Sequence, residues 1–228
     1  MINTSIFVVI PAYNEAEVIA DVVSEIRAAG DYGIIVVDDG SKDGTHERAA
    51  ACAGVFALKH RINRGKGAAT KTGIVAANRL GAEIVVTMDG DGQHDPVDIE
   101  ALTRPIREGS FDVVLGTRPR TTGEMPYIKI IANKIGNIVT WLLYGLHVSD
   151  SQSGFRAYSR YASGVIDTKA DKYEYDSKVI REIKNHRLNF TEIPIQVRYT
   201  QYSMKKPQKQ GFINGLRTLV RMIWSMIA

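Results

Sequence analysis

Short apolar runs alternate with amphipathic segments over the first half of the chain, and this alternation constrains the fold more than any other feature. The apolar runs are residues 6–10, 34–37, 55–58, 84–88 and 113–115. The segments of helical period between them are residues 15–29, 44–53, 65–80 and 96–108. Strands that are apolar on both faces and separated by helices are typical of a parallel sheet that is covered on both sides. We therefore expect an α/β fold, with a mostly parallel open sheet flanked by helices.

The second half of the chain has a different pattern. Residues 127–148 are apolar almost all round and predict a helix that is buried or lies against a membrane surface. Residues 190–197 predict a late strand, and residues 212–228 predict a helix with one apolar stripe. That last helix either docks on the core or lies in a membrane interface. We expect one domain over residues 1–228, with residues 205–228 as a basic amphipathic extension.

The charge of the chain is concentrated at its end. Its net charge is +4, but six of the 29 basic residues follow Glu192, the last acidic residue. Residues 1–192 therefore hold 23 basic against 25 acidic side chains, which argues against a surface that coats nucleic acid. The basic tail predicts an anionic partner such as phosphate, substrate or membrane. The single Cys52 excludes an internal disulfide and favours a reducing compartment.

No apolar run reaches the roughly 18–20 residues that span a bilayer, and the first residues read as a strand rather than a signal peptide. We therefore expect a chain that does not span a membrane.

Polar loops follow three of the predicted strands, at residues 11–15, 38–45 and 89–96. Ligands bind at the carboxyl ends of the strands in open α/β sheets. Asp89 and Asp91 flank a glycine there, and Gln93 offers a third oxygen, a set that suits Mg²⁺ or Mn²⁺. Zinc fits poorly because Cys and His ligands at zinc spacing are absent. The alternative is an Asp-Gly turn followed by a helix that Asp95 caps.

Two further loops have both a binding and a purely structural interpretation. Asp39 follows a buried strand and is expected to accept hydrogen bonds from a base or ribose, although its loop could be a simple turn. Lys66 lies between two glycines before a helix, where an anion is favoured. Direct phosphate contact by Lys66 and a tight loop into a helix remain equally open. Walker and dinucleotide-binding spacings are absent, which argues against those functions.

At these residues the sequence resembles glycosyltransferase family 2, with its GT-A fold, and within it the dolichyl- and polyprenyl-phosphate glycosyl synthases. The motifs that carry the resemblance are VVIPAYNE, VVDDGSKDGT, NRGKGAA, MDGDGQHDP, GTR and SDSQSGFRAYSR. They cover about residues 6–160 and are jointly very specific.

The resemblance implies roles for individual residues. The positions that match nucleotide-sugar binding are Pro11, Tyr13, Glu15 and Asp39. Those that match the metal and diphosphate loop are Asp89, Gly90, Asp91 and Gln93. Arg118 matches a basic residue near the transferred sugar or phosphate, and the acceptor-side motif is Ser153, Gly154, Phe155 and Arg156. Arg198 and Lys205 lie where the family closes cations over the diphosphate, in a sequence that departs from the usual arrangement.

The implied reaction is an inverting, metal-dependent transfer of a hexose, from a donor of the GDP-mannose or UDP-glucose type, to a dolichyl or polyprenyl phosphate. A hydroxyl acceptor would need a general base, for which Asp150 is the candidate, whereas a lipid phosphate needs cations such as Arg118 and Arg156. The alternatives are a saccharide or protein hydroxyl acceptor, and a non-catalytic nucleotide-sugar-binding module. We expect a peripheral protein at the cytoplasmic face of a membrane, with no nucleic-acid partner and an oligomeric state that the sequence leaves open.

Overall fold

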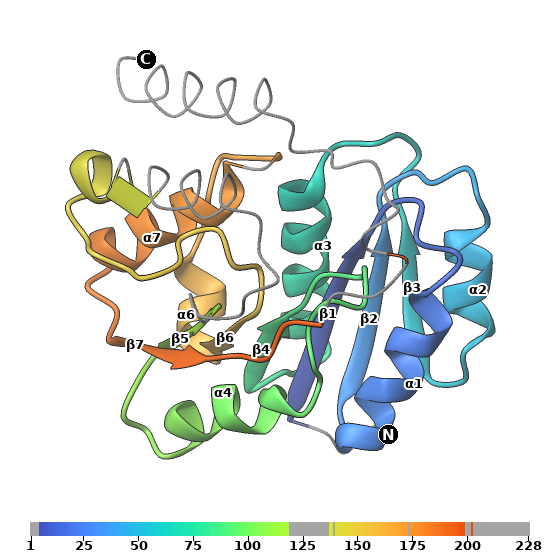
Figure 1. Cartoon of the computed structure of the whole chain (residues 1–228), viewed down its shortest axis with the longest axis horizontal. Coiled ribbons are helices and arrows are strands. Elements are labelled where there is room, and N and C mark those ends of the chain that lie inside the picture. Colours follow the sequence, from blue (N-terminus) through green and yellow to red (C-terminus); the bar gives the residue numbers. More distant parts are fainter. Residues whose placement is uncertain (1–4, 119–136, 139, 173, 199–201, 203–228) are drawn as a thin grey trace.

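A mixed sheet forms the centre of the protein in a computed structural model, which describes residues 5–118, 137–138, 140–172, 174–198 and 202 (Figure 1). Its strands are β1 (Ile6–Ala12), β2 (Gly33–Asp38), β3 (Val55–Lys59), β4 (Ile84–Thr87), β5 (Val113–Thr117), β6 (Arg156–Ser159) and β7 (Phe190–Pro194). The order across the sheet is β3-β2-β1-β4-β6-β5-β7. Only β6 runs antiparallel to its neighbours, β4 and β5, so the predicted mostly parallel sheet is confirmed.

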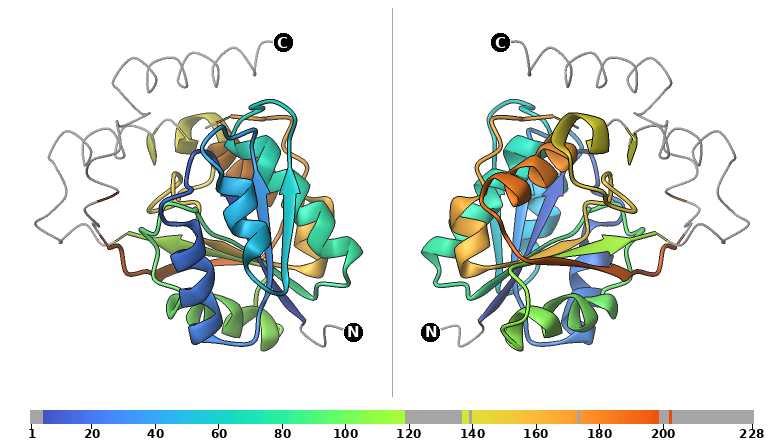
Figure 2. Two further views of the ribbon diagram at one scale, coloured as in Figure 1. Left: turned by 90° about the vertical axis from the view of Figure 1, so that its right-hand side faces the viewer. Right: turned by 90° about the vertical axis from the view of Figure 1, so that its left-hand side faces the viewer.

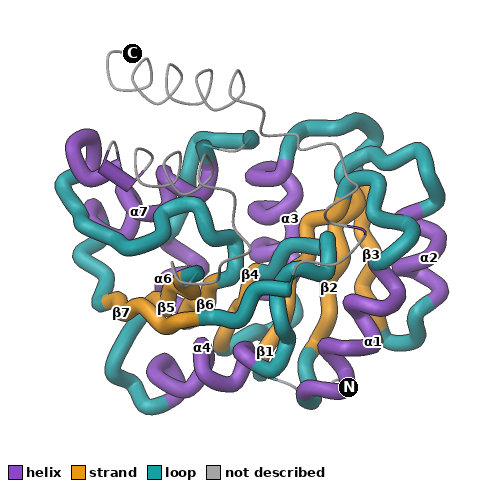
Figure 3. Tube along the Cα trace, in the orientation of Figure 1, coloured by secondary structure: helices purple, strands orange, loops and turns teal. Residues whose placement is uncertain are grey.

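Helices cover both faces of this sheet (Figures 2 and 3). They are α1 (Ile19–Ala29), α2 (Thr45–Ala51), α3 (Lys66–Arg79), α4 (Asp98–Arg107), α6 (Arg160–Val165) and α7 (Tyr175–Asn185). Successive side chains of β1 point to opposite faces of the sheet, so the strand contributes to two cores. Ile6, Val8 and Ile10 pack with α1 and α4, whereas Phe7 and Val9 pack with α3 on the opposite face. A third core joins β5 and β6 to α6 and α7.

Each predicted strand of the first half forms, within a residue or two of its expected ends, and the helices between them are shorter than expected. α1 starts at Ile19 rather than residue 15 because the preceding residues form a turn, in which the carbonyl of Glu15 accepts the Ile19 amide at 2.9 Å. The sequence did not predict β6, α6 and α7. Their segments are short or polar, and their hydrophobic faces are defined only by the sheet on which they pack.

Two of the predicted helices fall largely outside the described residues. In the segment 127–148, residues 137–138 and 140–144 are helical, and the chain leaves the helix at Gly145, whose φ is 65°. The helix predicted for residues 212–228 and the basic residue Lys205 lie outside the described residues. Among the residues that are described, no helix is both long enough and apolar enough to cross a bilayer.

Arg156, the first residue of β6, is a buried connector rather than a surface cation. Its side chain is only 1% exposed. The guanidinium donates to the carbonyls of Ser153 (2.8 Å), Ser151 (2.9 Å) and Asp176 (3.0 Å), and so ties the loop before β6 to α7. The expectation that Arg156 binds an acceptor phosphate is therefore wrong, because its buried guanidinium donates to three backbone carbonyls of the protein.

Replacing Arg156 by methionine should destabilise the protein, because it leaves three buried carbonyls without donors. We expect Arg156→Met to lower the free energy of unfolding by about 3 kcal/mol or more. Urea unfolding followed by circular dichroism measures this change. Arg160→Met, at the exposed first residue of α6, is the matched control and should change stability by less than about 0.5 kcal/mol. Equal midpoints for the two variants would contradict the structural role of Arg156.

Candidate active site

The carboxyl ends of β1, β2 and β4 carry the three polar loops to one edge of the sheet. These strands are parallel neighbours, with Ala12 of β1 paired to Asp38 of β2 and Val9 of β1 paired to Thr87 of β4. Their loops are therefore adjacent, as the sequence predicted. The same edge receives the start of α3 and the start of α7.

The loops after β1 and β2 are joined by hydrogen bonds. The Asn14 amide donates to Ser41 Oγ at 2.8 Å, and the Glu15 amide donates to Thr45 Oγ1 at 2.9 Å. Asn14 has a positive φ of 55°, which turns the chain after β1. Pro11, inside β1, and Tyr13 are both partly exposed at this end of the strand. The arrangement brings the predicted nucleotide-binding residues together, and their contact with a nucleotide stays a prediction.

Tyr202 adds a contact that the sequence did not reveal. Its hydroxyl donates to Glu15 Oε2 at 2.8 Å and to the Asn14 carbonyl at 3.1 Å, across more than 180 residues of chain. Burial and the nearby Glu15 carboxylate raise the pKa of the Tyr202 hydroxyl. The hydroxyl therefore stays protonated and keeps donating to the β1 loop. A tyrosine in a polar tail has no signal in the sequence that marks such a contact.

Asp39 orders the loop that leads to Lys66. The Asp39 carboxylate is 2% exposed and accepts the backbone amides of Arg64 (3.0 Å) and Gly65 (2.7 Å). It also lies 2.7 Å from His60 Nδ1. Both carboxylate oxygens thus have partners within the protein. The role that the structure shows for Asp39 is to fix this loop, and its predicted contact with ribose or base stays a prediction.

Lys66 joins two carboxylates that come from distant parts of the chain. Its Nζ lies 2.8 Å from Asp89 Oδ1 and 3.1 Å from Asp176 Oδ2. The sequence missed Asp176, because an acidic residue in the first turn of α7 reads as an ordinary helix-start residue. Only the fold brings α7 beside the loop after β4.

The charges of this cluster are fixed by their mutual proximity. Burial alone would lower the pKa of Lys66, but Asp176 and Asp89 outweigh it and raise that pKa. Burial alone would raise the pKa of Asp89, but Lys66 and then His94 lower it well below its usual range. Lys66 and Asp89 are therefore both charged at neutral pH.

The rest of the predicted metal loop is more open. Asp91 and Gln93 are partly exposed, and Asp91 Oδ1 accepts the Gln93 amide at 3.1 Å. In the part of the chain that the structure describes, no three His, Cys, Asp or Glu side chains are grouped to hold a metal ion. Two carboxylates and one amide oxygen still fit a hard cation that takes its other ligands from water or phosphate.

Two glycines make room around this loop. A Cβ on Gly154 would lie 2.6 Å from Lys66 Nζ and 2.8 Å from Asp89 Oδ1, so a side chain there would displace the ion pair. A Cβ on Gly90 would lie 3.1 Å from Ile10 Cγ2. The lack of a side chain at Gly90 therefore lets the loop lie close against β1. The acceptor-side motif of the sequence, which contains Gly154, therefore lies directly beside the metal loop. Phe155 follows it and packs its ring 5.0 Å from His94.

Arg118 and Asp150 form a two-point ion pair. Arg118 Nε lies 2.6 Å from Asp150 Oδ2, and Nη2 donates to Oδ1 at 2.9 Å. Burial favours a raised pKa for Asp150, but the hydrogen bonds and charge of Arg118 lower it. A general base needs a pKa near the working pH, so this ion pair argues against Asp150 as the base, and its catalytic role stays a prediction. The predicted contact of Arg118 with phosphate or sugar stays a prediction.

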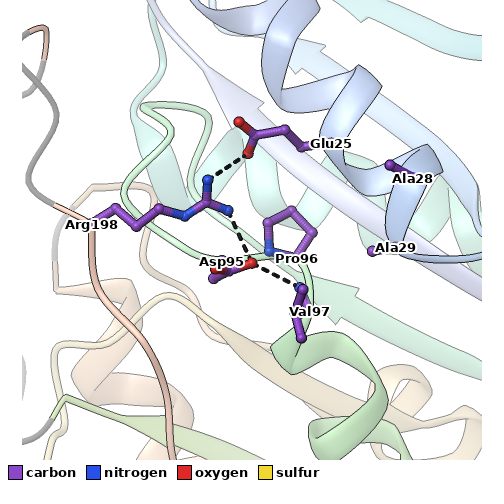
Figure 4. A pocket seen from close by; sticks show the side chains of 7 residues that line it. All are labelled: Glu25, Ala28, Ala29, Asp95, Pro96, Val97 and Arg198. Carbon is purple, nitrogen blue, oxygen red and sulfur yellow. Dashed lines mark hydrogen bonds and ion pairs between the residues drawn. The ribbon is translucent and has the colours of Figure 1, made fainter.

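Arg198 lies apart from the metal loop's carboxylates. Figure 4 shows its guanidinium between α1 and the start of α4, with Nη1 3.2 Å from Glu25 Oε2 and Nη2 3.0 Å from Asp95 Oδ1. Its backbone amide donates to the Gln93 carbonyl at 2.8 Å. In this structure Arg198 joins the loop before α4 to α1, and its predicted contact with the diphosphate stays a prediction. Asp95 begins the turn before α4 by accepting the Val97 amide at 3.1 Å.

Comparison with known proteins gives this geometry a family. The family model described as glycosyl transferase family 2 matches residues 7–166. A dolichyl-phosphate N-acetylglucosaminyltransferase of Methanococcus voltae, named for a UDP-N-acetylglucosamine donor, is 39% identical over 90% of both chains. The polyprenol monophosphomannose synthase of Mycolicibacterium smegmatis is 32% identical over 82% of this chain and 75% of its own. An uncharacterised protein of Methanocaldococcus jannaschii is 40% identical over 97% of this chain and 92% of its own.

Solved structures agree on the fold. Glucosyl-3-phosphoglycerate synthase from Mycobacterium tuberculosis, crystallised with Mn²⁺, uridine diphosphate and its product, superposes with a TM-score of 0.76 at 23% identity. The match covers 98% of this chain and 80% of that one. It confirms the expected GT-A fold. Together with the family model and the relatives, it shows that the chain is a glycosyltransferase and belongs to glycosyltransferase family 2.

Proposed function

We propose that this enzyme transfers a sugar from a nucleotide-sugar donor to a polyprenyl or dolichyl phosphate. The relatives from Methanococcus voltae and Mycolicibacterium smegmatis, which match over most of their length, are named for such acceptors. The undecaprenyl-phosphate mannosyltransferase of Micrococcus luteus is named for another, and is 27% identical over 98% of this chain.

One structural observation favours a phosphate acceptor over a hydroxyl. Three carboxylates at the described site, Asp89, Asp150 and Asp176, each lie within 3.1 Å of a lysine or arginine nitrogen. A hydroxyl acceptor must lose a proton to a base, and a carboxylate held by a cation is a weak base. A phosphate monoester is already anionic at neutral pH and attacks without losing a proton. The second candidate, a saccharide or protein hydroxyl acceptor, is therefore less well supported.

We assign the divalent cation to the loop after β4. Asp89, Asp91 and Gln93 would hold it through oxygen atoms, and Mg²⁺ and Mn²⁺ both suit such a set. When bound, such a cation neutralises the charge that develops on a leaving diphosphate. The metal-free pair of Asp89 with Lys66 is compatible with this assignment, because a carboxylate has two oxygens and Asp89 keeps 30% of its side chain exposed.

The chemistry that the proposal requires is a single displacement. An oxygen of the lipid phosphate forms a bond to the anomeric carbon, and the bond from that carbon to the nucleoside diphosphate breaks. Attack opposite the leaving group inverts the anomeric centre. Asp39 contributes by fixing the loop before α3, and Lys66 supplies positive charge beside the metal loop.

A membrane-surface location fits the exposed side chains near the site. Ile138, Trp141 and Leu142, on the helical residues 137–138 and 140–144, are 47%, 49% and 68% exposed. Large apolar side chains of this kind suit contact with lipid. We extend the proposal to peripheral binding at the cytoplasmic face, with the basic tail toward anionic headgroups.

The donor and acceptor can be identified in one assay of nucleoside diphosphate release. UDP-N-acetylglucosamine, UDP-glucose and GDP-mannose are each combined with a short polyprenyl phosphate, the matching polyprenol, or a soluble saccharide. We expect release with one donor, only with the phosphorylated lipid and only with Mg²⁺ or Mn²⁺ present. Turnover with the saccharide would overturn the acceptor class, and full turnover in excess chelator would overturn the metal requirement.

Asp91→Asn tests the metal loop directly. Removing one carboxylate from the cation's ligands should lower kcat/KM by about 100-fold or more. The melting temperature without metal should stay close to that of the wild type, because Asp91 is partly exposed. The control is Asp21→Asn, the same change at an exposed position of α1, which should retain full activity. Wild-type kinetics of Asp91→Asn would exclude Asp91 as a ligand.

A further inference from the structure

Lys66 occupies a position that is unfavourable for a cation unless anions surround it. It is the first residue of α3, and the positive end of the helix dipole disfavours a cation there. Its Nζ is nevertheless placed between Asp89 and Asp176, which come from the loop after β4 and from the first turn of α7. Gly154, which has no side chain, leaves the space that Lys66 Nζ and the Asp89 carboxylate occupy.

The two carboxylates differ in exposure. Asp176 is 7% exposed at its side chain and lies behind Lys66, which is 21% exposed, whereas Asp89 is 30% exposed on the open side. A buried carboxylate without a counter-ion is costly, so Asp176 requires the ammonium more strongly than Asp89 does. Asp176 is thus the permanent partner of Lys66, and Asp89 is the partner that an incoming cation can reach.

A divalent cation and the Lys66 ammonium cannot both bind Asp89 closely without repelling each other. The loop carboxylates Asp89 and Asp91, together with Asp176, outnumber the single ammonium and leave a net charge of −2. This charge matches one divalent cation. Repulsion between the two cations then favours Lys66 on Asp176 alone, with Asp89 left to the divalent cation.

We propose that Lys66 is a built-in counter-ion of the metal site, which holds Asp89 before the divalent cation binds and moves to Asp176 alone when it does. The inference rests on the metal site assigned above. It gives Asp176 a positioning role, since this carboxylate retains the displaced ammonium. It also predicts that removing the charge of Lys66 and removing the charge of Asp176 change the metal affinity in opposite directions.

The test is Mn²⁺ binding without donor, measured by electron paramagnetic resonance of free Mn²⁺ or by calorimetry. Lys66→Met removes the competitor, so it should tighten Mn²⁺ binding by about tenfold, which corresponds to about 1.4 kcal/mol. Asp176→Asn leaves the displaced ammonium without a partner, so it should weaken binding. In the double variant, which combines Lys66→Met with Asp176→Asn, no ammonium remains to be retained. The loss of Asp176 should then have no further effect, and Mn²⁺ should bind to the double variant as tightly as to Lys66→Met.

Lys71→Met is the matched control. Lys71 lies on the same helix, and its Nζ pairs with Asp171 Oδ1 at 2.6 Å, away from the metal loop. It should leave Mn²⁺ affinity unchanged, whereas a general loss of charge near α3 would make it behave like Lys66→Met.

Several outcomes would overturn the proposal. Folded Lys66→Met that binds Mn²⁺ equally or more weakly than the wild type contradicts competition at Asp89. If Asp176→Asn binds Mn²⁺ as tightly as the wild type does, Asp176 does not retain the Lys66 ammonium. This measurement decides the question if Lys66→Met does not fold. A wild-type protein that binds no Mn²⁺ would instead refute the metal site itself, a result that the glycosyl-transfer assay with chelator reports independently.

Discussion

The ion pair network of Lys66 with Asp89 and Asp176 is the interaction on which the site depends. It connects the start of α3, the loop after β4 and the start of α7, and its two carboxylates are 87 residues apart in the chain. Without the ammonium, the carboxylates of Asp89 and Asp176 would lose the counter-ion that they share. The network therefore stabilises the approach of the two halves of the fold as well as setting the charge of the metal loop.

A second set of contacts, made by two arginines, fixes the loops that surround this network. Arg156 donates to three backbone carbonyls and orients the loop that carries Gly154, while its bond to the Asp176 carbonyl places the start of α7. Arg198 binds Glu25 and Asp95 and, through its backbone, the Gln93 carbonyl. Two arginines that looked like ligands for phosphate thus hold the loops that carry the site. A guanidinium suits this purpose because its five donors reach several acceptors at once, backbone carbonyls for Arg156 and carboxylates for Arg198.

The polar loops and the exposed apolar side chains come from different parts of the chain. The polar loops gather at the carboxyl ends of β1, β2 and β4, and the exposed apolar side chains of residues 138–142 belong to a different segment. An enzyme that joins a water-soluble donor to a lipid phosphate needs both surfaces. The slightly acidic body supplies carboxylates for a cation, and the basic residues after Glu192 match the anionic partners that the proposed reaction requires.

The sequence by itself determined the parallel half of the sheet, the strand-end loops and the family. Strands that are apolar on both faces require helices on both faces, and this pattern is local, so residues 6–115 could be interpreted without coordinates. Motifs such as MDGDGQHDP are equally local. The tertiary structure alone decided which charges meet. Asp176 joins Lys66 across 110 residues, and Arg156 turns inward rather than toward a ligand. Both follow because β6 lies antiparallel between β4 and β5 and α7 packs against it, an arrangement that no spacing in the sequence encodes.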